Sequence, residues 1–271
     1  MGYCIIVAGA FHWLLRRLPK ISGAGFVLLL ALLSQKTLER NIVWKSDFTL
    51  HEAGAALLPE NVKMMTNYGM MLHDAANEEA RPAEERKDFL KRAVDVYQQS
   101  LANIGEQHFP NLYFVYGNYL QEQGKVEEAK SMYQKGLEKR DKTGTTLSLL
   151  NNLGMINFKL KAHKESEDAF LNCLAISPTH ASAINGLAVL YASTGQHSAS
   201  EARFKEVVAL MPEYTEAKFN YGTMLAGIDE RLHDAKDMFN EVLAVNPAHS
   251  GATTNMKYVD FKIDQLNNAK G

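Results

Sequence analysis

Small and apolar residues recur along this chain with a period of 34 residues, most regularly between residues 147 and 247. Each copy has two apolar stretches separated by a polar turn, and each ends at a proline. This spacing predicts a pair of helices that is repeated along the chain. The repeated positions in the two clearest copies are Leu150, Leu153, Gly154, Ser166, Phe170, Cys173 and Pro178, then Ile184, Leu187, Ala188, Ser200, Phe204, Val207 and Pro212.

The period of 34, with a small residue at position 8 and proline at position 32, resembles the tetratricopeptide repeat. The same frame extends over five units, which start at Val62, Pro110, Leu147, Ala181 and Thr215. A small residue at position 8 lets the two helices of a pair approach closely, and we expect the aromatic residue at position 24 to fill the space under the small residue at position 20. The residues at position 8 are Gly69, Gly117, Gly154, Ala188 and Gly222.

Two departures from the period are expected. Residues 75–91 form an insertion, which we expect to lengthen the second helix backwards and to leave a loop near 75–81. Pro59 falls on the last position of a unit, so residues 42–57 are interpreted as a lone second helix. Residues 250–266 are predicted to form a final, more polar helix, as the exposed end of a repeat array requires.

The N-terminal 40 residues have a different pattern. Residues 1–15 and 21–33 are apolar, and Arg16, Arg17 and Lys20 lie between them. Neither run reaches the length of a complete membrane span. We nevertheless favour a membrane hairpin, a truncated span followed by one over about 21–38, because these runs lack helical alternation; a soluble helix pair is the alternative. The basic residues would then face the cytosol, and the chain after about residue 40 would lie on the other side.

Charge and candidate chemistry exclude several classes of function. The net charge is −2 over 271 residues, and residues 41–271 carry more acidic than basic side chains, which argues against binding to nucleic acid. The histidines are scattered and form no metal-binding spacing, and paired acids such as Glu84 and Glu85 fit exposed helix starts. Cys4 and Cys173 are interpreted as buried apolar residues. We therefore expect no catalytic residue, no metal site and no cofactor in this chain.

The stretch from residue 1 to residue 68 carries a second resemblance. It begins with an apolar helix that contains MGYC, continues with a short basic loop and then has a second apolar helix. The residues that follow in order are Trp44, Leu50, Gly54, Pro59, Asn61, Lys63, Asn67 and Tyr68. This order is similar to the junction between the last membrane helices and the first repeats of the transmembrane and tetratricopeptide repeat-containing (TMTC) proteins. The resemblance covers the chain as the C-terminal part of such a protein, with Met1 as an internal methionine.

The TMTC resemblance has implications for function. It implies an endoplasmic reticulum membrane protein linked to O-mannosylation of cadherins, with luminal repeats and a dolichyl-phosphate mannose donor used by the full-length protein. In that family the glycosyl-transfer site belongs to an N-terminal multispan region, and no position of this chain matches it. Whether this chain takes part in an enzyme reaction is therefore left open.

A row of asparagines on the predicted first helices is the candidate binding site. Position 6 of a unit, which we expect to face the concave groove, is Asn67, Asn152 and Asn220 in units one, three and five, whereas Val115 and Gly186 interrupt the row. An amide offers two donors and an acceptor, so such a row can bind the backbone of an extended peptide. Solvated polar residues without a ligand are the alternative. Neighbouring positions of the same groove add Asn118, Asn151 and Asn185.

Together these observations predict an all-α tetratricopeptide-repeat superhelix of about five helix pairs. The expected organisation is a membrane segment at 1–40, a junction half-repeat at 41–60, repeats at 62–249 and a C-terminal helix and tail at 250–271. The leading hypothesis is the luminal protein-binding region of an O-mannosyltransferase-like membrane protein, with a protein or cadherin-like peptide acceptor as partner. The alternative is a membrane-tethered adaptor that takes no part in glycosyl transfer.

Overall fold

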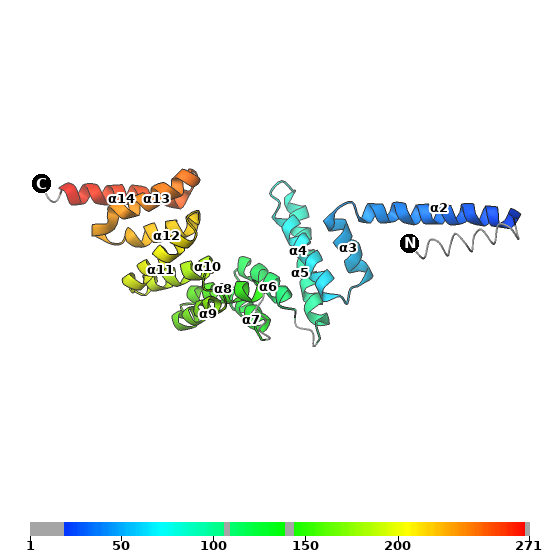
Figure 1. Cartoon of the computed structure of the whole chain (residues 1–271), viewed down its shortest axis with the longest axis horizontal. Coiled ribbons are helices and arrows are strands. Elements are labelled where there is room, and N and C mark those ends of the chain that lie inside the picture. The colour runs from blue at the N-terminus through cyan, green and yellow to red at the C-terminus, as the bar shows by residue number, and fades with distance from the viewer. Residues whose placement is uncertain (1–18, 106–108, 139–143, 269–271) are drawn as a thin grey trace. The chain divides into compact units, whose positions relative to one another are not determined.

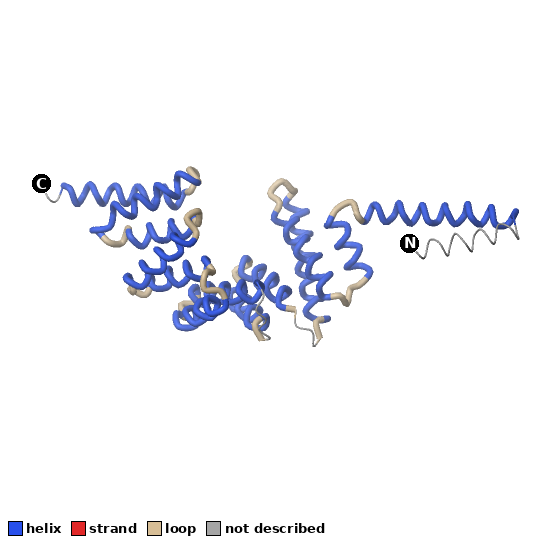
Figure 2. Tube along the Cα trace, in the orientation of Figure 1, coloured by secondary structure: helices blue, strands red, loops and turns tan. Residues whose placement is uncertain are grey.

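A computed structural model describes residues 19–105, 109–138 and 144–268 of the chain. These residues form helices joined by turns, and no strand occurs among them (Figure 1, Figure 2). The predicted fold class, an all-α tetratricopeptide-repeat superhelix, is confirmed. The chain divides into two compact units, residues 1–105 and residues 106–271, which are described separately.

The first unit begins, within the described residues, with the long helix α2 (Pro19–Val43). This helix covers the second apolar run of the sequence, whereas residues 1–18, with the first run and most of the basic loop, lie outside the described part. Residues 19–105, 109–138 and 144–268 contain no helix that combines the length and the hydropathy of a membrane span.

Three helices follow α2 in the first unit: α3 (Asp47–Leu57), α4 (Val62–Asn77) and α5 (Ala83–Asn103). The lone second helix expected at 42–57 is shorter than predicted, because Ser46 caps α3. The Ser46 hydroxyl accepts from the Thr49 backbone N–H, and the Thr49 side chain accepts from the Ser46 N–H. The insertion lengthens α5 backwards to Ala83 and leaves a loop at 78–82, close to the predicted place.

The second unit contains four helix pairs and a last single helix, which matches the predicted units two to five and the final helix. A short 3₁₀ helix lies between the two helices of the last pair. In chain order the helices are α6 (Pro110–Glu122), α7 (Val126–Gly136), α8 (Gly144–Lys159), α9 (His163–Ile176), α10 (Ala181–Ser193), α11 (His197–Leu210), α12 (Thr215–Leu225), η1 (Asp229–Arg231), α13 (Leu232–Val245) and α14 (Ser250–Asn268).

Close packing within each pair depends on the small residue at position 8. A Cβ atom added to Gly117 would lie 2.4 Å from the Tyr133 ring, and one added to Gly154 would lie 2.6 Å from the Phe170 ring. The aromatic residue at position 24 therefore lies against position 8. At position 20 of unit three, the Ser166 hydroxyl donates a hydrogen bond to the Gly154 carbonyl over 2.8 Å.

The final helix α14 closes the second unit with one buried face. Val259 is fully buried, and Met256 and Ile263 pack against the same core. Lys236 on α13 binds Asp260 on α14 over 2.5 Å. The outer face is less polar than expected, since Tyr258 and Phe261 are exposed.

Candidate peptide-binding face

The predicted asparagines divide between the two units. Asn67 lies on α4 in the first unit and is half-buried. The others lie on the first helices of the pairs in the second unit, and the structure joins most of them by hydrogen bonds between neighbouring first helices. We call these residues the asparagine row: Asn118 on α6, Asn151 and Asn152 on α8, Asn185 on α10 and Asn220 on α12.

The first bridge of the asparagine row connects α8 to α6. The Asn152 amide nitrogen donates to the Asn118 carbonyl oxygen over 2.8 Å, and the Tyr133 hydroxyl of α7 donates to the same oxygen over 2.8 Å. The Tyr133 ring is fully buried, so its hydroxyl needs a partner, and Asn118 supplies one. Three helices of two consecutive pairs therefore meet at one amide oxygen.

The second bridge connects α12 to α10. The Asn220 amide nitrogen donates to the Asn185 carbonyl oxygen over 3.3 Å, and Asn185 is only 6% exposed. The same side of the array continues from α12 to α14, where the Asn255 amide donates to the Thr223 hydroxyl over 3.1 Å. Sequence reasoning missed Asn255, because the last helix was assigned only a capping role; its spacing of 35 residues from Asn220 was the signal.

Between the two bridges the row is interrupted at Gly186. A Cβ atom at this position would lie 2.4 Å from the Phe170 ring of the preceding pair. Gly186, at position 6 of its unit, thus faces the aromatic residue on the second helix of the preceding pair as well as the asparagine row. Asn151 lies on α8, where its amide nitrogen donates to the Asn152 side-chain oxygen over 3.5 Å, and its own side-chain oxygen is buried without a hydrogen-bond partner among the described residues.

The electrostatic character of the row is neutral. Burial raises the pKa of Tyr133 to about 12, with the Asn152 hydrogen bond acting in the opposite direction, so the hydroxyl stays protonated at neutral pH. Nearby, burial raises the pKa of Cys173 to about 11, which keeps this fully buried residue a thiol, as the sequence interpretation requires. Amides and a neutral phenol can donate and accept hydrogen bonds, but they supply no general acid or base at neutral pH.

In the first unit, the neighbour of Asn67 serves a different purpose. The Tyr68 hydroxyl donates to the Glu52 carboxylate over 3.0 Å, and the Arg92 guanidinium donates to the same oxygen over 2.9 Å. Burial and then the Glu52 hydrogen bond raise the pKa of Tyr68. These contacts join α3, α4 and α5, so this cluster holds the half-repeat to the first complete pair.

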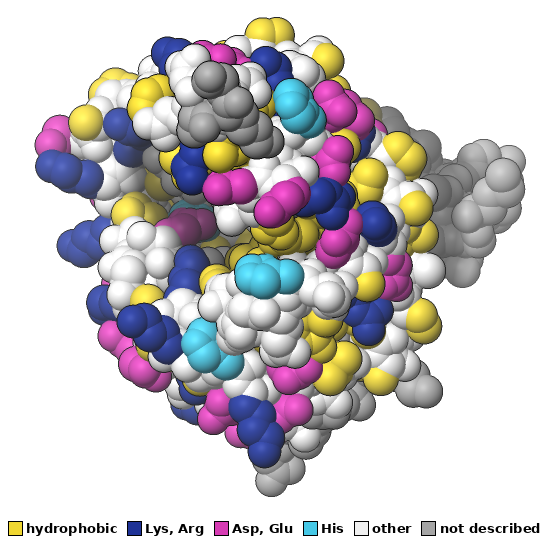
Figure 3. Space-filling view, turned by 90° about the vertical axis from the view of Figure 1, so that its left-hand side faces the viewer, with side chains coloured by type: hydrophobic (Ala, Val, Ile, Leu, Met, Phe, Trp, Pro, Cys, Tyr) yellow, Lys and Arg dark blue, Asp and Glu magenta, His cyan; other side chains and the backbone are white. Residues whose placement is uncertain are grey.

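Metal ligands do not cluster in the described part of the chain, and the face seen in Figure 3 carries mixed charge. Among residues 19–105, 109–138 and 144–268, no three His, Cys, Asp or Glu side chains gather as a metal site would require. The face in Figure 3 mixes Lys and Arg with Asp and Glu, with no broad patch of either sign.

Comparisons with known proteins agree with this architecture. Profiles of the tetratricopeptide repeat match residues 145–213 and 110–138. Protein O-mannosyl-transferase TMTC1 of Mus musculus is 38% identical over 85 residues, which cover 30% of this chain and 9% of that protein. Protein O-mannosyl-transferase TMTC3 of Mus musculus is 26% identical over 264 residues, which cover 83% of this chain and 28% of that protein.

A solved structure shows the same fold. YrrB, described as a TPR protein with an unusual peptide-binding site, superposes with a TM-score of 0.53 at 19% identity, covering 76% of this chain and 97% of YrrB. Helix pairs, repeat period and profile matches together define a tetratricopeptide-repeat protein, a class whose members bind peptides or proteins.

Within that class, the relatives confirm the predicted resemblance to the C-terminal, repeat-bearing part of the TMTC O-mannosyltransferase family. The chain spans less than a third of the length of each of the two mouse relatives.

Proposed function

We propose that the asparagine row binds the backbone of an extended protein segment, and that this segment is the acceptor of an O-mannosyl transfer carried out by a longer TMTC-like protein. The observation that carries the proposal is the alignment of amides on neighbouring first helices, where Asn152 contacts Asn118 and Asn220 contacts Asn185.

The geometry favours recognition of backbone groups over side chains. An extended peptide presents an N–H or a C=O every few ångströms, and the row presents neutral amide groups from one repeat to the next. The solved neighbour YrrB is described as binding a peptide, which supports a peptide as ligand class. The relatives named as O-mannosyltransferases support an acceptor polypeptide as the biological source of that peptide.

Membrane placement is part of the proposal. We infer that the chain is held at the endoplasmic reticulum membrane with its repeats in the lumen, where mannose is supplied by a dolichyl-phosphate donor. A cadherin-like extracellular domain is the acceptor that the family resemblance implies. The reaction itself is assigned to a part of the longer protein that this chain does not match, so the role proposed here is holding the acceptor.

Peptide binding tests the row. The probe is a fluorescent peptide from an extracellular strand of a cadherin, rich in serine and threonine, measured by anisotropy with the full chain. Each lost hydrogen bond costs about 1 kcal/mol, so the double variant Asn152→Ala/Asn220→Ala is expected to weaken binding roughly tenfold or more. The matched control is Asn172→Ala, an exposed asparagine on α9, which is expected to bind like the parent.

Two results would contradict the proposal. Equal affinity of the double variant and the parent, with unchanged circular dichroism, means that the row does not bind this ligand. Digestion of residues 41–271 by trypsin added outside intact microsomes places the repeats in the cytosol. The second result, combined with peptide binding, would favour the membrane-tethered adaptor.

A further inference from the structure

Helix α2 differs from the repeat helices because its apolar side chains are exposed to solvent. Over the described run, Val27, Leu28 and Leu32 are 67%, 62% and 54% exposed. Four consecutive apolar residues of this run point in successive directions around the helix, so the apolar surface surrounds α2 instead of forming one stripe. An apolar surface of this extent indicates a contact with an apolar phase.

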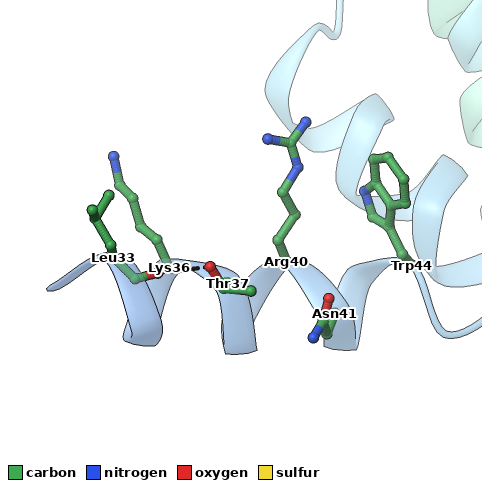
Figure 4. A pocket seen from close by; sticks show the side chains of 6 residues that line it. All are labelled: Leu33, Lys36, Thr37, Arg40, Asn41 and Trp44. Carbon is green, nitrogen blue, oxygen red and sulfur yellow. Dashed lines mark hydrogen bonds between the residues drawn. The ribbon is translucent and has the colours of Figure 1, made fainter. Parts of the chain in front are cut away.

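Cationic and aromatic side chains follow the apolar run on one side of the helix. Lys36, Arg40 and Trp44 are spaced four residues apart, and Figure 4 shows all three projecting to the same side. The Arg40 guanidinium carbon lies 5.3 Å from the centre of the Trp44 ring, within cation–π range. Together with Leu33, Thr37 and Asn41, these residues line an open hollow of about 550 Å³.

The positive charges on this side are available to an external anion. Neither Lys36 nor Arg40 forms an ion pair with any residue that the structure describes. The neighbouring acid, Glu39, accepts a hydrogen bond from Gln35 over 3.0 Å. The Thr37 hydroxyl donates to the Leu33 carbonyl over 2.8 Å, so it does not compete for the cations.

A second hollow connects the cations to the leucines. It measures about 430 Å³ and shares Leu33 and Lys36 with the first hollow, while Leu29 and Leu32 extend it toward the apolar run. With a helical rise of about 1.5 Å per residue, Leu29 and Lys36 are roughly 10 Å apart along the axis. The surface thus passes from apolar to cationic over about the depth of a lipid headgroup and the first carbons of its chains.

We propose that this side of α2 binds an anionic phospholipid in a bilayer, with the lipid phosphate between Lys36 and Arg40 and its acyl chains along Leu29, Leu32 and Leu33. Arg40 can offer two parallel N–H groups to the phosphate, and Lys36 adds a compact positive charge. Trp44 occupies the level at which tryptophan is enriched in membrane proteins, the interface between headgroups and water.

Charge and shape favour a lipid over a protein partner. A partner helix would cover one stripe, whereas the apolar residues surround α2. A free phosphate ion would use the cations but leave the leucines in water. The phospholipid accounts for both, since its negative headgroup and its chains are joined in one molecule.

The test measures binding of the full chain to vesicles. The chain is synthesised in a cell-free system in the presence of vesicles of phosphatidylcholine alone or mixed with phosphatidylserine, and binding is measured by flotation. A Trp13→Phe background makes Trp44 the fluorescent reporter. We expect stronger binding to the anionic vesicles, a blue shift of Trp44 emission, and weaker binding as salt increases.

The double variant Lys36→Gln/Arg40→Gln is expected to bind the anionic vesicles about thirty-fold more weakly, and neutral vesicles as the parent does. The matched control is Lys91→Gln/Lys159→Gln, which removes the same charge from exposed positions on α5 and α8 and is expected to change binding less than twofold. An equal loss in both variants, binding independent of phosphatidylserine, or a Trp44 shift produced by inorganic phosphate without vesicles would each overturn the proposal.

Discussion

At two consecutive junctions between helix pairs, different residues at position 6 pack against the aromatic residue of the preceding pair. At the junction of α7 with α8, position 24 is Tyr133, and the next pair presents Asn152 to its hydroxyl. At the junction of α9 with α10, position 24 is Phe170, and the next pair presents Gly186 to its ring. At these two junctions the residue at position 6 therefore differs together with the aromatic residue that it meets. The junction of α11 with α12 departs from this pairing, because Phe204 at position 24 precedes Asn220 in the asparagine row.

The largest effect is expected from removing the aromatic ring at the glycine junction. Phe170 is fully buried and contacts both Gly154 and Gly186. Phe170→Ala is expected to lower the free energy of unfolding by about 3–5 kcal/mol, because it leaves a cavity between two pairs. Urea unfolding followed by circular dichroism measures the change. The control Phe261→Ala removes a ring that is 60% exposed and is expected to cost less than about 0.5 kcal/mol.

Restoring an asparagine at the interruption tests the matching directly. Gly186→Asn places its Cβ 2.4 Å from the Phe170 ring, so we expect a loss of about 1–3 kcal/mol from overpacking. The double variant with Phe170→Leu is expected to lose less than the sum of the two single variants. Gly144→Asn is the control, because a Cβ there meets nothing within 4 Å. Additive losses in the double variant would show that position 6 and the preceding ring are not coupled.

A smaller effect is expected from removing the hydroxyl at the amide junction. Tyr133→Phe leaves the Asn118 oxygen with Asn152 as its remaining donor, and about 1 kcal/mol is expected to be lost. The reverse change, Phe170→Tyr, adds a hydroxyl at a junction without an amide partner and is expected to destabilise by about 1–3 kcal/mol. The urea midpoints of both variants measure these changes, and a stabilised Phe170→Tyr variant would contradict the comparison.

The last effect is confined to alkaline pH. The pKa of Tyr133 is about 12 in the folded chain and about 10 when unfolded, so the folded state holds this proton more tightly. The resulting stability is complete below pH about 10 and is lost as the pH rises from about 10 to 12. Tyr133→Phe is therefore expected to lose less stability than the parent over this range. Urea midpoints measured at several pH values test it, and parallel curves for the two proteins would contradict it.

The repeat frame was the part most accessible from sequence. Small residues at one phase and aromatic residues 16 positions later predict close helix pairs, because a large side chain would not fit between the helices, and the packing at Gly117 and Gly154 agrees. The start of α3 was placed too early, since the capping by Ser46 and Thr49 is a local contact that the 34-residue period does not contain.

The candidate site was predicted less completely than the fold. The period identified which asparagines share a face, but it did not show that their amides bind one another, because those hydrogen bonds depend on side-chain conformations. It also gave no reason for Gly186, which becomes clear only when Phe170 of the preceding pair is seen against it.

The shared oxygen of Asn118 also has a mechanical consequence. It receives Asn152 from one repeat and Tyr133 from another helix of its own repeat, so it resists the hinge motion by which consecutive repeats bend. A ligand that accepts the hydrogen bond of Asn152 or Tyr133 in place of Asn118 would make that hinge more flexible. A ligand that bridges the interruption of the row at Gly186 would make the array stiffer. Occupancy of the row would then be readable as a change in the elasticity of the second unit under force.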